Sequence, residues 1–187
     1  MSYRVSSLLV AAGLSALLSA CATPSHEHGH GQGGMKGPIA VATLTPTQGN
    51  GVRGVVAFHA HDGHLLVHAR ISGLKPNGEH GFHLHEKGDC ASADGTSAGG
   101  HFNPSGQPHG PQNAAHHAGD LPSLKADAQG NADVHFTVDG PSLDASNAGY
   151  IVGRSVIVHA NPDDYTTQPT GNAGGRVACG VIAALPH

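Results

Sequence analysis

Residues 52–71, VRGVVAFHAHDGHLLVHARI, contain the clearest fold signal in this sequence. Two strand-like runs, residues 52–61 and 64–71, flank the dipeptide Asp62-Gly63. Asp-Gly between two such runs is a strong hairpin signal, because both central residues of the tightest turn need positive φ. The stretch therefore predicts two antiparallel strands joined by a two-residue turn.

Alternate side chains of a strand point to opposite faces. In the second run one face is apolar and is predicted to join the core: Leu65, Val67, Ala69 and Ile71. The other face carries His64, Leu66, His68 and Arg70. The hairpin therefore gathers four histidines on its outer face: His59, His61, His64 and His68. We expect these to be solvated, with a surface metal site as the alternative.

Similar short runs continue along the chain, separated by glycine and proline. Further strands are predicted at residues 39–44, 81–85, 132–138, 151–159 and 176–183. No segment has a sustained 3.6-residue apolar period, and no internal repeat is present. With 28 glycines, 12 prolines and 4% aromatic residues, the composition favours an all-β sandwich or flattened barrel. At 187 residues and 38% hydrophobic, one domain is expected.

Two long stretches interrupt the strands, at residues 86–129 and 161–175. Loops of this length in a compact domain are usually functional or disordered. These two carry much of the chain's potential chemistry, including His101, His109, His117 and Asp120. We therefore predict two long functional loops.

The first residues resemble an export signal. One positive charge, Arg4, precedes an uncharged run at residues 5–18, which is too short for a comfortable transmembrane helix. The ending Leu18-Ser19-Ala20-Cys21 resembles a bacterial lipobox, which would make Cys21 the lipidated first residue of the mature chain. An ordinary signal peptide is the alternative. The lipobox predicts a location in the bacterial envelope, facing the periplasm, with a lipid anchor as the only membrane contact.

The predicted organisation is a signal peptide at residues 1–20, a flexible tether at 22–37 and one domain at 38–187. The tether is rich in glycine and histidine. Its His26, His28 and His30 alternate with other residues, a spacing that can chelate a divalent metal. A low-complexity linker without that role is an equal alternative, and a copper-loading arm for the domain is a third.

Charge excludes one class of partner. The chain has nine basic and 13 acidic residues, a formal net charge of −4, and the mature form without Arg4 would carry −5. Because no basic surface is expected, nucleic acid is not a predicted partner.

If Cys21 carries lipid, only Cys90 and Cys179 remain. In an oxidising compartment two cysteines most simply form one disulfide. It would close a loop of about 90 residues and contribute roughly 4 kcal/mol on the chain-entropy model. A pair of buried free thiols is the alternative.

The 17 histidines include a pattern typical of metal ligands. His83 and His85 are two apart in a predicted strand and so share a face. Three loop histidines and one carboxylate form a complete tetrahedral zinc set: His101, His109, His117 and Asp120. His159 ends another strand and would join His83 and His85. Three imidazoles with an open position suit a redox-active copper. Unconnected surface histidines are the alternative.

Five motifs resemble, in the same order, the signatures of the copper/zinc superoxide dismutase family. They are GFHLHE at residues 81–86, AGGHFNP at 98–104, HAGDL at 117–121, GRSVIVH at 153–159 and GNAGGRVACG at 171–180. The resemblance covers residues 39–183 and is to the bacterial exported branch. It implies a Greek-key, eight-stranded flattened β-barrel. It also implies disproportionation of superoxide to dioxygen and hydrogen peroxide by Cu(II)/Cu(I) cycling, protecting against extracytoplasmic superoxide.

The same resemblance implies one copper ion and one zinc ion per chain. Copper would be held by His83, His85, His101 and His159. Zinc would be held by His101, His109, His117 and Asp120. His101 would then bridge the two metals as an imidazolate. His116 adjoins His117, but the HAGD register favours His117.

Two further roles follow from the resemblance, and a third is suggested where the sequence departs from the family pattern. Asp163 would hydrogen-bond copper and zinc histidines together, the alternative being a solvated turn with Asp164. Arg176 would hold the superoxide anion and, with His101, be catalytic, the alternative being a surface salt bridge. The loop at residues 164–176 is short and lacks the charged cluster of the animal-type pattern. Lys87 is therefore the candidate for steering superoxide, unless it is merely solvated beside Asp89.

The competing class is a non-enzymatic envelope protein on the same scaffold that binds copper or zinc, or delivers copper. Such proteins typically lack a copper ligand or the arginine. This chain keeps all of them, which favours the enzyme. Monomer and homodimer remain open alternatives.

Overall fold

The computed structural model describes residues 39–186. The predicted signal peptide, the lipidation site Cys21 and the tether histidines His26, His28 and His30 lie outside the described residues. Within the described part, no helix is both long enough and apolar enough to cross a membrane.

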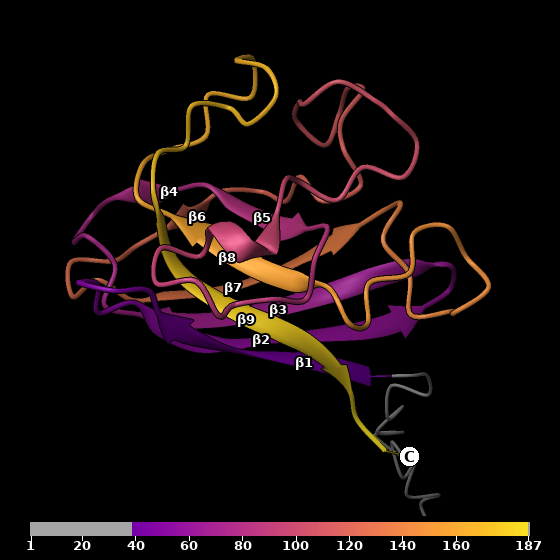
Figure 1. Cartoon of the computed structure of the whole chain (residues 1–187), viewed down its shortest axis with the longest axis horizontal. Coiled ribbons are helices and arrows are strands. Elements are labelled where there is room, and N and C mark those ends of the chain that lie inside the picture. The colour runs from indigo at the N-terminus through magenta and orange to yellow at the C-terminus, as the bar shows by residue number, and fades with distance from the viewer. Residues whose placement is uncertain (1–38, 187) are drawn as a thin grey trace, which may run out of the picture. The chain divides into compact units, whose positions relative to one another are not determined.

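Seven antiparallel strands form one sheet in the order β5-β8-β9-β1-β2-β3-β7 (Figure 1). Their bounds are β1 Ile39–Pro46, β2 Arg53–His61, β3 His64–Ser72, β5 Phe82–His85, β7 Ala132–Val138, β8 Ser155–His159 and β9 Arg176–Ala184. A second, two-stranded sheet pairs β4 (Glu79–His80) with β6 (Leu124–Lys125), and one 3-10 turn, η1, spans Thr96–Ala98. Residues 39–186 contain no α-helix, so the predicted all-β class is confirmed.

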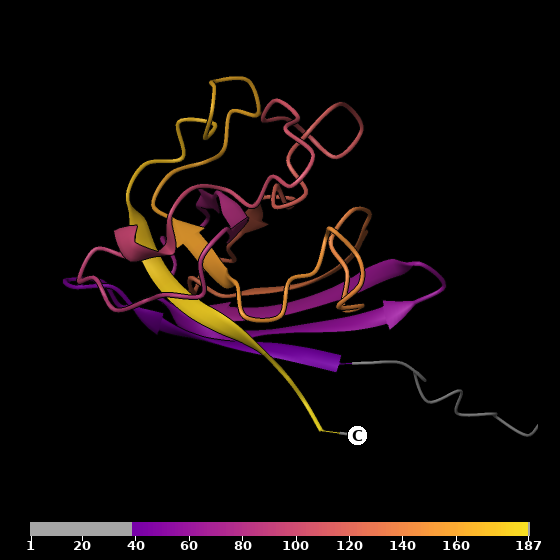
Figure 2. The ribbon, with the colours of Figure 1, turned by 45° about the vertical axis from the view of Figure 1, so that its right-hand side comes forward.

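The large sheet curls around the core. Figures 1 and 2 show β5 and β8 lying over the layer that contains β1, β2 and β3. Phe82 of β5 meets Phe136 of β7 edge to face, with ring centroids 6.5 Å apart, so the two edge strands of the sheet contact each other through side chains. This closure is the flattened barrel that the sequence predicts.

The predicted hairpin is present. Asp62 and Gly63 have φ of 48° and 87°, as the two-residue turn requires, and His61 pairs with His64. The apolar face of β3 is at most 3% exposed, and its residues are Leu65, Val67, Ala69 and Ile71. Full burial of a side chain such as Leu65 or Val67 contributes roughly 1.5–3 kcal/mol, which fixes the register of the strand.

Most strand boundaries lie within two residues of the prediction, with one larger difference. The strand expected over residues 151–159 begins at Ser155, because Gly153 takes a φ of 82° and the Arg154 N–H donates to the Ile151 carbonyl in a turn. The small sheet of β4 and β6 was not predicted. Two residues per strand are too few to show alternation.

The two long loops lie on one side of the sheet. In Figures 1 and 2 the loop around residues 103–118 and the loop of residues 161–175 both rise away from β1 and β2. Hydrogen bonds join them: the Tyr165 hydroxyl donates to Ser123 Oγ at 2.9 Å and accepts from the Ser123 N–H at 2.8 Å. The candidate ligands come from these loops and from the ends of β5 and β8.

Candidate metal centre

Three strand histidines and one loop histidine meet at one end of the sheet. β5 is buried along its whole length and carries His83 and His85. β8 pairs with β5 and ends at His159, where its pairing with β9 shifts register. His101, from the first long loop, forms an isolated bridge with His85. Each of the four can place one ring nitrogen within 4.8 Å of the nitrogens of the others.

The inward nitrogens of this first cluster have no hydrogen-bond partner within the described chain. They are His83 Nδ1, His85 Nε2, His101 Nε2 and His159 Nε2, and all are buried. A buried polar atom left unpaired costs roughly 1–3 kcal/mol. Four such atoms converging on one point fit a bound metal ion, which would accept all four lone pairs.

The opposite nitrogens are held by hydrogen bonds. His85 Nδ1 donates to the Gly99 carbonyl at 2.9 Å, and His159 Nδ1 donates to the Gly174 carbonyl at 3.1 Å. His83 Nε2 lies 2.7 Å from Asp163 Oδ2. These bonds place the proton on the outer nitrogen and turn the lone pair inward. Burial lowers the pKa of His83 to about 4 and that of His159 to about 3, so both rings are neutral and ready to ligate at neutral pH.

The second cluster adjoins the first and is organised around one carboxylate. Asp120 Oδ1 lies 2.8 Å from His101 Nδ1, 3.0 Å from His109 Nδ1 and 3.2 Å from His117 Nδ1. Its other oxygen accepts the His117 N–H at 2.9 Å and the Gly110 N–H at 3.1 Å. Three imidazoles and a carboxylate are a tetrahedral zinc donor set.

The carboxylate also controls protonation in this cluster. Burial would raise the pKa of Asp120, but hydrogen bonds from His101 and His109 outweigh it and lower that pKa far below its usual range. Burial would lower the pKa of His109, yet the carboxylates of Asp120 and Asp163 raise it to about 9. Excess negative charge in this cluster therefore favours a cation.

His101 belongs to both clusters. Its Nδ1 faces Asp120, and its Nε2 is one of the four unpartnered nitrogens of the first cluster. His116 is partly buried, and its Nδ1 bonds the Ala114 carbonyl at 2.7 Å, so it joins neither. The structure therefore places His117, and not His116, beside Asp120.

Asp163 connects the clusters from behind. Its Oδ2 lies 2.7 Å from His83 Nε2, and its Oδ1 lies 2.9 Å from His109 Nε2 and accepts the Tyr165 N–H at 2.7 Å. The Asp163 carboxylate fits here only because residue 171 is glycine: a Cβ at Gly171 would lie 1.8 Å from Asp163 Oδ1. The solvated turn considered as the alternative describes the exposed Asp164 instead, which bonds Thr166 and Thr167.

Sequence reasoning missed a residue that positions a ligand. The Gln168 side-chain amide bonds the His109 backbone twice: Oε1 accepts its N–H and Nε2 donates to its carbonyl, each at 2.8 Å. Gln112 similarly donates to the Asp120 carbonyl. Contacts to backbone leave no residue pattern, so no sequence signal could have found either one.

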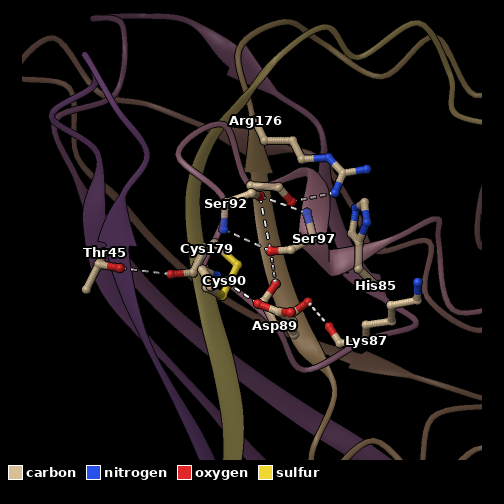
Figure 3. Close-up of a disulfide and its surroundings, with 12 residues drawn as sticks. Thr45, His85, Lys87, Asp89, Cys90, Ser92, Ser97, Arg176 and Cys179 are labelled. Carbon is tan, nitrogen blue, oxygen red and sulfur yellow. Dashed lines mark hydrogen bonds between the residues drawn. A yellow bond between two sulfur atoms is a disulfide. The ribbon is translucent and has the colours of Figure 1, made fainter.

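Arg176 opens β9 beside the first cluster (Figure 3). Its Nη1 donates to the Gly95 carbonyl and its Nη2 to the Gly99 carbonyl, both at 2.6 Å. Because Gly99 also accepts from His85, one carbonyl aligns the arginine and a first-cluster histidine. Burial lowers the pKa of Arg176, but a guanidinium stays charged at neutral pH.

Cys90 and Cys179 form a disulfide, as predicted (Figure 3). It joins the first long loop to β9, with the Cα atoms 5.7 Å apart. Ser97 Oγ donates to the Asp89 carbonyl at 3.0 Å, which closes the loop on itself next to the bridge. Lys87 is exposed on this loop near Asp89.

Fold and clusters together define a β-barrel protein whose buried histidines are compatible with copper and zinc binding. The chain belongs to the copper/zinc superoxide dismutase (SODC) family, whose model matches residues 52–182.

Solved structures support the same family. The clock protein EA4 is 41% identical, with a TM-score of 0.70, over 79% of this chain and 94% of its own. A SOD-like protein from Bacillus subtilis is 37% identical, with a TM-score of 0.69, over 75% of this chain and 96% of its own. A double mutant of that protein, in which a tyrosine and a proline are replaced by histidines, is 38% identical over 76% and 96%, with a TM-score of 0.70. These descriptions differ from one another, so activity has to be argued from this chain's residues.

Proposed function

We propose that this protein is a superoxide dismutase: two superoxide ions and two protons give one dioxygen and one hydrogen peroxide. The observation that carries the proposal is the set of four buried, unpartnered histidine nitrogens that converge beside Arg176. A protein that only stores metal does not need a fixed cation next to its ligands. An enzyme that acts on an anionic substrate does need one, because the cation stabilises the negative charge of the substrate.

The donor atoms support one copper and one zinc per chain. Copper would be held by His83 Nδ1 and by the Nε2 atoms of His85, His101 and His159. Zinc would be held by Asp120 Oδ1 and by the Nδ1 atoms of His101, His109 and His117. Copper, when bound, supplies alternate one-electron oxidation and reduction of superoxide, and zinc supplies a fixed charge that does not change oxidation state.

Arg176 is the proposed anion-binding residue. Two of its N–H groups are tied to carbonyls, which holds the guanidinium in place and leaves other N–H groups for a ligand. It lines a surface hollow of about 330 Å³ together with Thr47, Asn50, Asp94 and Gly175, so solvent and small ions can reach it. A positioned cation of this kind stabilises negative charge as it accumulates on the bound oxygen species.

His101 is the proposed proton donor to the product. When its Nε2 is not a copper ligand, that nitrogen would hold a proton and pass it to the forming peroxide, while its Nδ1 stays with Asp120 in the zinc set. Asp120 keeps the ring in place during the transfer. Lys87 is the proposed steering charge, and a slower rate in a Lys87→Gln variant at low ionic strength only would support that role.

The test is metal analysis together with a superoxide dismutation assay. We expect about one copper and one zinc in the purified protein. A His159→Ala variant should keep zinc, lose copper and show no dismutation above background. His116→Ala is the matched control, because it removes a histidine that adjoins the zinc set without belonging to it and should leave metal content and rate unchanged.

Full activity in the His159→Ala variant would overturn the copper assignment. A parent protein that holds both metals without dismutation would instead support the non-enzymatic, metal-binding or copper-delivering alternative. The neighbours described as SOD-like and as a clock protein make that alternative worth testing directly.

The disulfide indicates an oxidising, non-cytoplasmic location. We further propose that residues 1–20 are removed and that Cys21 carries lipid, which anchors the domain of residues 38–187 to a membrane of the bacterial envelope. Palmitate incorporation that a Cys21→Ser variant abolishes would support this, and incorporation that persists would contradict it.

A further inference from the structure

The outer face of β3 and β7 carries a second concentration of histidine and aspartate. His68 lies directly across the β3–β7 ladder from His135, and Arg70 lies across from Asp133. These side chains face away from the core, since their neighbours Val67 and Ala69 are buried on the opposite face. None of them belongs to the two buried clusters.

Three of these residues each offer a ligand atom within 4.8 Å of the other two. The rings of His68 and His135 stack with centroids 3.7 Å apart and an interplanar angle of 22°. Asp133 Oδ1 lies 2.9 Å from His68 Nε2 and 3.6 Å from His135 Nε2. A tetrahedral zinc ion with bonds of about 2.0–2.1 Å keeps its ligand atoms about 3.4 Å apart, close to both distances from Asp133 Oδ1. The exposed His135 ring must turn out of the stack to point its lone pair at the same ion.

The hydrogen bonds at His68 conflict with each other. Its Nε2 has an acceptor, Asp133 Oδ1, at 2.9 Å and a donor, Arg70 Nε, at 3.1 Å. If Nε2 carries a proton, it faces the Arg70 N–H as a second donor. If Nε2 carries none, it faces the Asp133 oxygen as a second acceptor. A metal cation between Nε2 and Oδ1 removes the conflict, because both atoms then donate a lone pair to it.

We propose that His68, Asp133 and His135 form a third metal site, on the protein surface, that takes a borderline divalent cation such as Zn²⁺. Two imidazoles and one carboxylate suit this class of ion. The Asp133 and His135 side chains are 62% and 69% exposed, so water can reach the ion and complete its coordination. Arg70 is 70% exposed, and its side chain can turn into solvent when the cation binds.

Other histidines of this face lack the full set. His64 pairs with Asp139, and His61 lies 3.4 Å from Asp62. Among the described residues, neither pair belongs to a group of three potential ligands. His59 lines the hollow of about 280 Å³ that also borders His68 and His135, but it is not within ligand distance of the cluster. The site therefore depends on β7, which brings Asp133 and His135 next to His68 although they are 65 and 67 positions further along the chain.

The test is a calorimetric Zn²⁺ titration of the full chain, already loaded with copper and zinc and freed of excess metal. We expect a His135→Ala variant to bind one equivalent fewer than the parent. His64→Ala is the matched control. It removes an exposed histidine with an aspartate partner from β3, the strand of His68, and should bind as many Zn²⁺ equivalents as the parent. Binding elsewhere, including at the tether histidines, is common to all variants and cancels in the comparison.

Two further measurements separate this proposal from nonspecific binding. Arg70→Ala should raise about fivefold the affinity for the Zn²⁺ equivalent that His135→Ala loses, as expected when one like charge is removed at an exposed site. The ¹⁵N signals of the His68 and His135 rings should shift on Zn²⁺ addition in the parent. Equal stoichiometry in the parent and His135→Ala, or ring signals that do not move, would overturn the proposal. Unchanged circular dichroism in His135→Ala would show that the variant remains folded.

Discussion

Asp163 connects the two histidine clusters from behind. Each of its oxygens faces a ring nitrogen, of His83 on one side and His109 on the other. Hydrogen bonds from those rings, together with the Tyr165 N–H, lower the pKa of Asp163 below its usual range even though burial would raise it. The carboxylate is therefore ionised and accepts from both rings at once.

We expect Asp163→Asn to weaken zinc binding about 10–100-fold, the range typical for loss of a partner to a metal-ligating histidine. The amide has the same shape but only one accepting oxygen, so its NH₂ group must oppose the N–H of His83 or His109. The measurement is zinc retention against a competing chelator.

Asp164→Asn is the matched control for this prediction. Asp164 is exposed and its side chain bonds only the neighbouring Thr166 and Thr167 among the described residues, so its amide variant should retain zinc as the parent does. Equal zinc retention in the Asp163 and Asp164 variants would show that the connection between the clusters does not support metal binding.

At the scale of elements, the disulfide ties the loop after β5 to β9. The same loop supplies the Gly95 and Gly99 carbonyls that hold Arg176, so the bridge and the arginine anchor one segment at two points (Figure 3). The bridge closes a loop with a sequence separation of 89 residues.

Replacing both cysteines, Cys90→Ala with Cys179→Ala, should lower the free energy of unfolding by about 4 kcal/mol. The physical reason is the greater conformational freedom of the unfolded chain once the long loop is open. Urea denaturation of the metal-free parent and variant measures the difference. Reduction of the parent should shift its midpoint in the same direction. Coincident unfolding curves for the oxidised parent and the variant would contradict this account.

How far the sequence predicts structure differs between elements. The β2–β3 hairpin was predicted because nine-residue strands show alternation and the Asp-Gly turn marks their junction. The candidate ligands could be singled out because their motifs are local, and the structure brings them together. β4 and β6 are too short to carry a pattern. The pairing of His68 with His135 joins residues far apart in sequence, and Gln168 acts through backbone atoms of His109, so neither leaves a local signal.

At the scale of the whole molecule, the pH dependence of stability without metal is set by histidines whose pKa values folding shifts in opposite directions. His83 and His159 have pKa values of about 4 and 3, below the 6.5 of an ordinary histidine, mainly because of burial. As pH falls below 6.5, these two histidines bind protons in the unfolded chain but not in the folded one, so acid destabilises the fold. His109 behaves in the opposite way: its pKa of about 9 stabilises the fold below pH 6.5, and that contribution is lost as pH rises toward 9.

The metal-free protein should therefore be most stable near pH 6.5 and less stable toward both pH 4 and pH 9. Urea midpoints measured across that range test the prediction. His159→Asn removes one of the rings that resist protonation and should flatten the acid side while leaving the alkaline side unchanged. A midpoint that rises steadily from pH 4 to pH 9 would mean that the carboxylates around His109 do not hold its proton. That result would also weaken the argument that excess negative charge in the second cluster favours a cation.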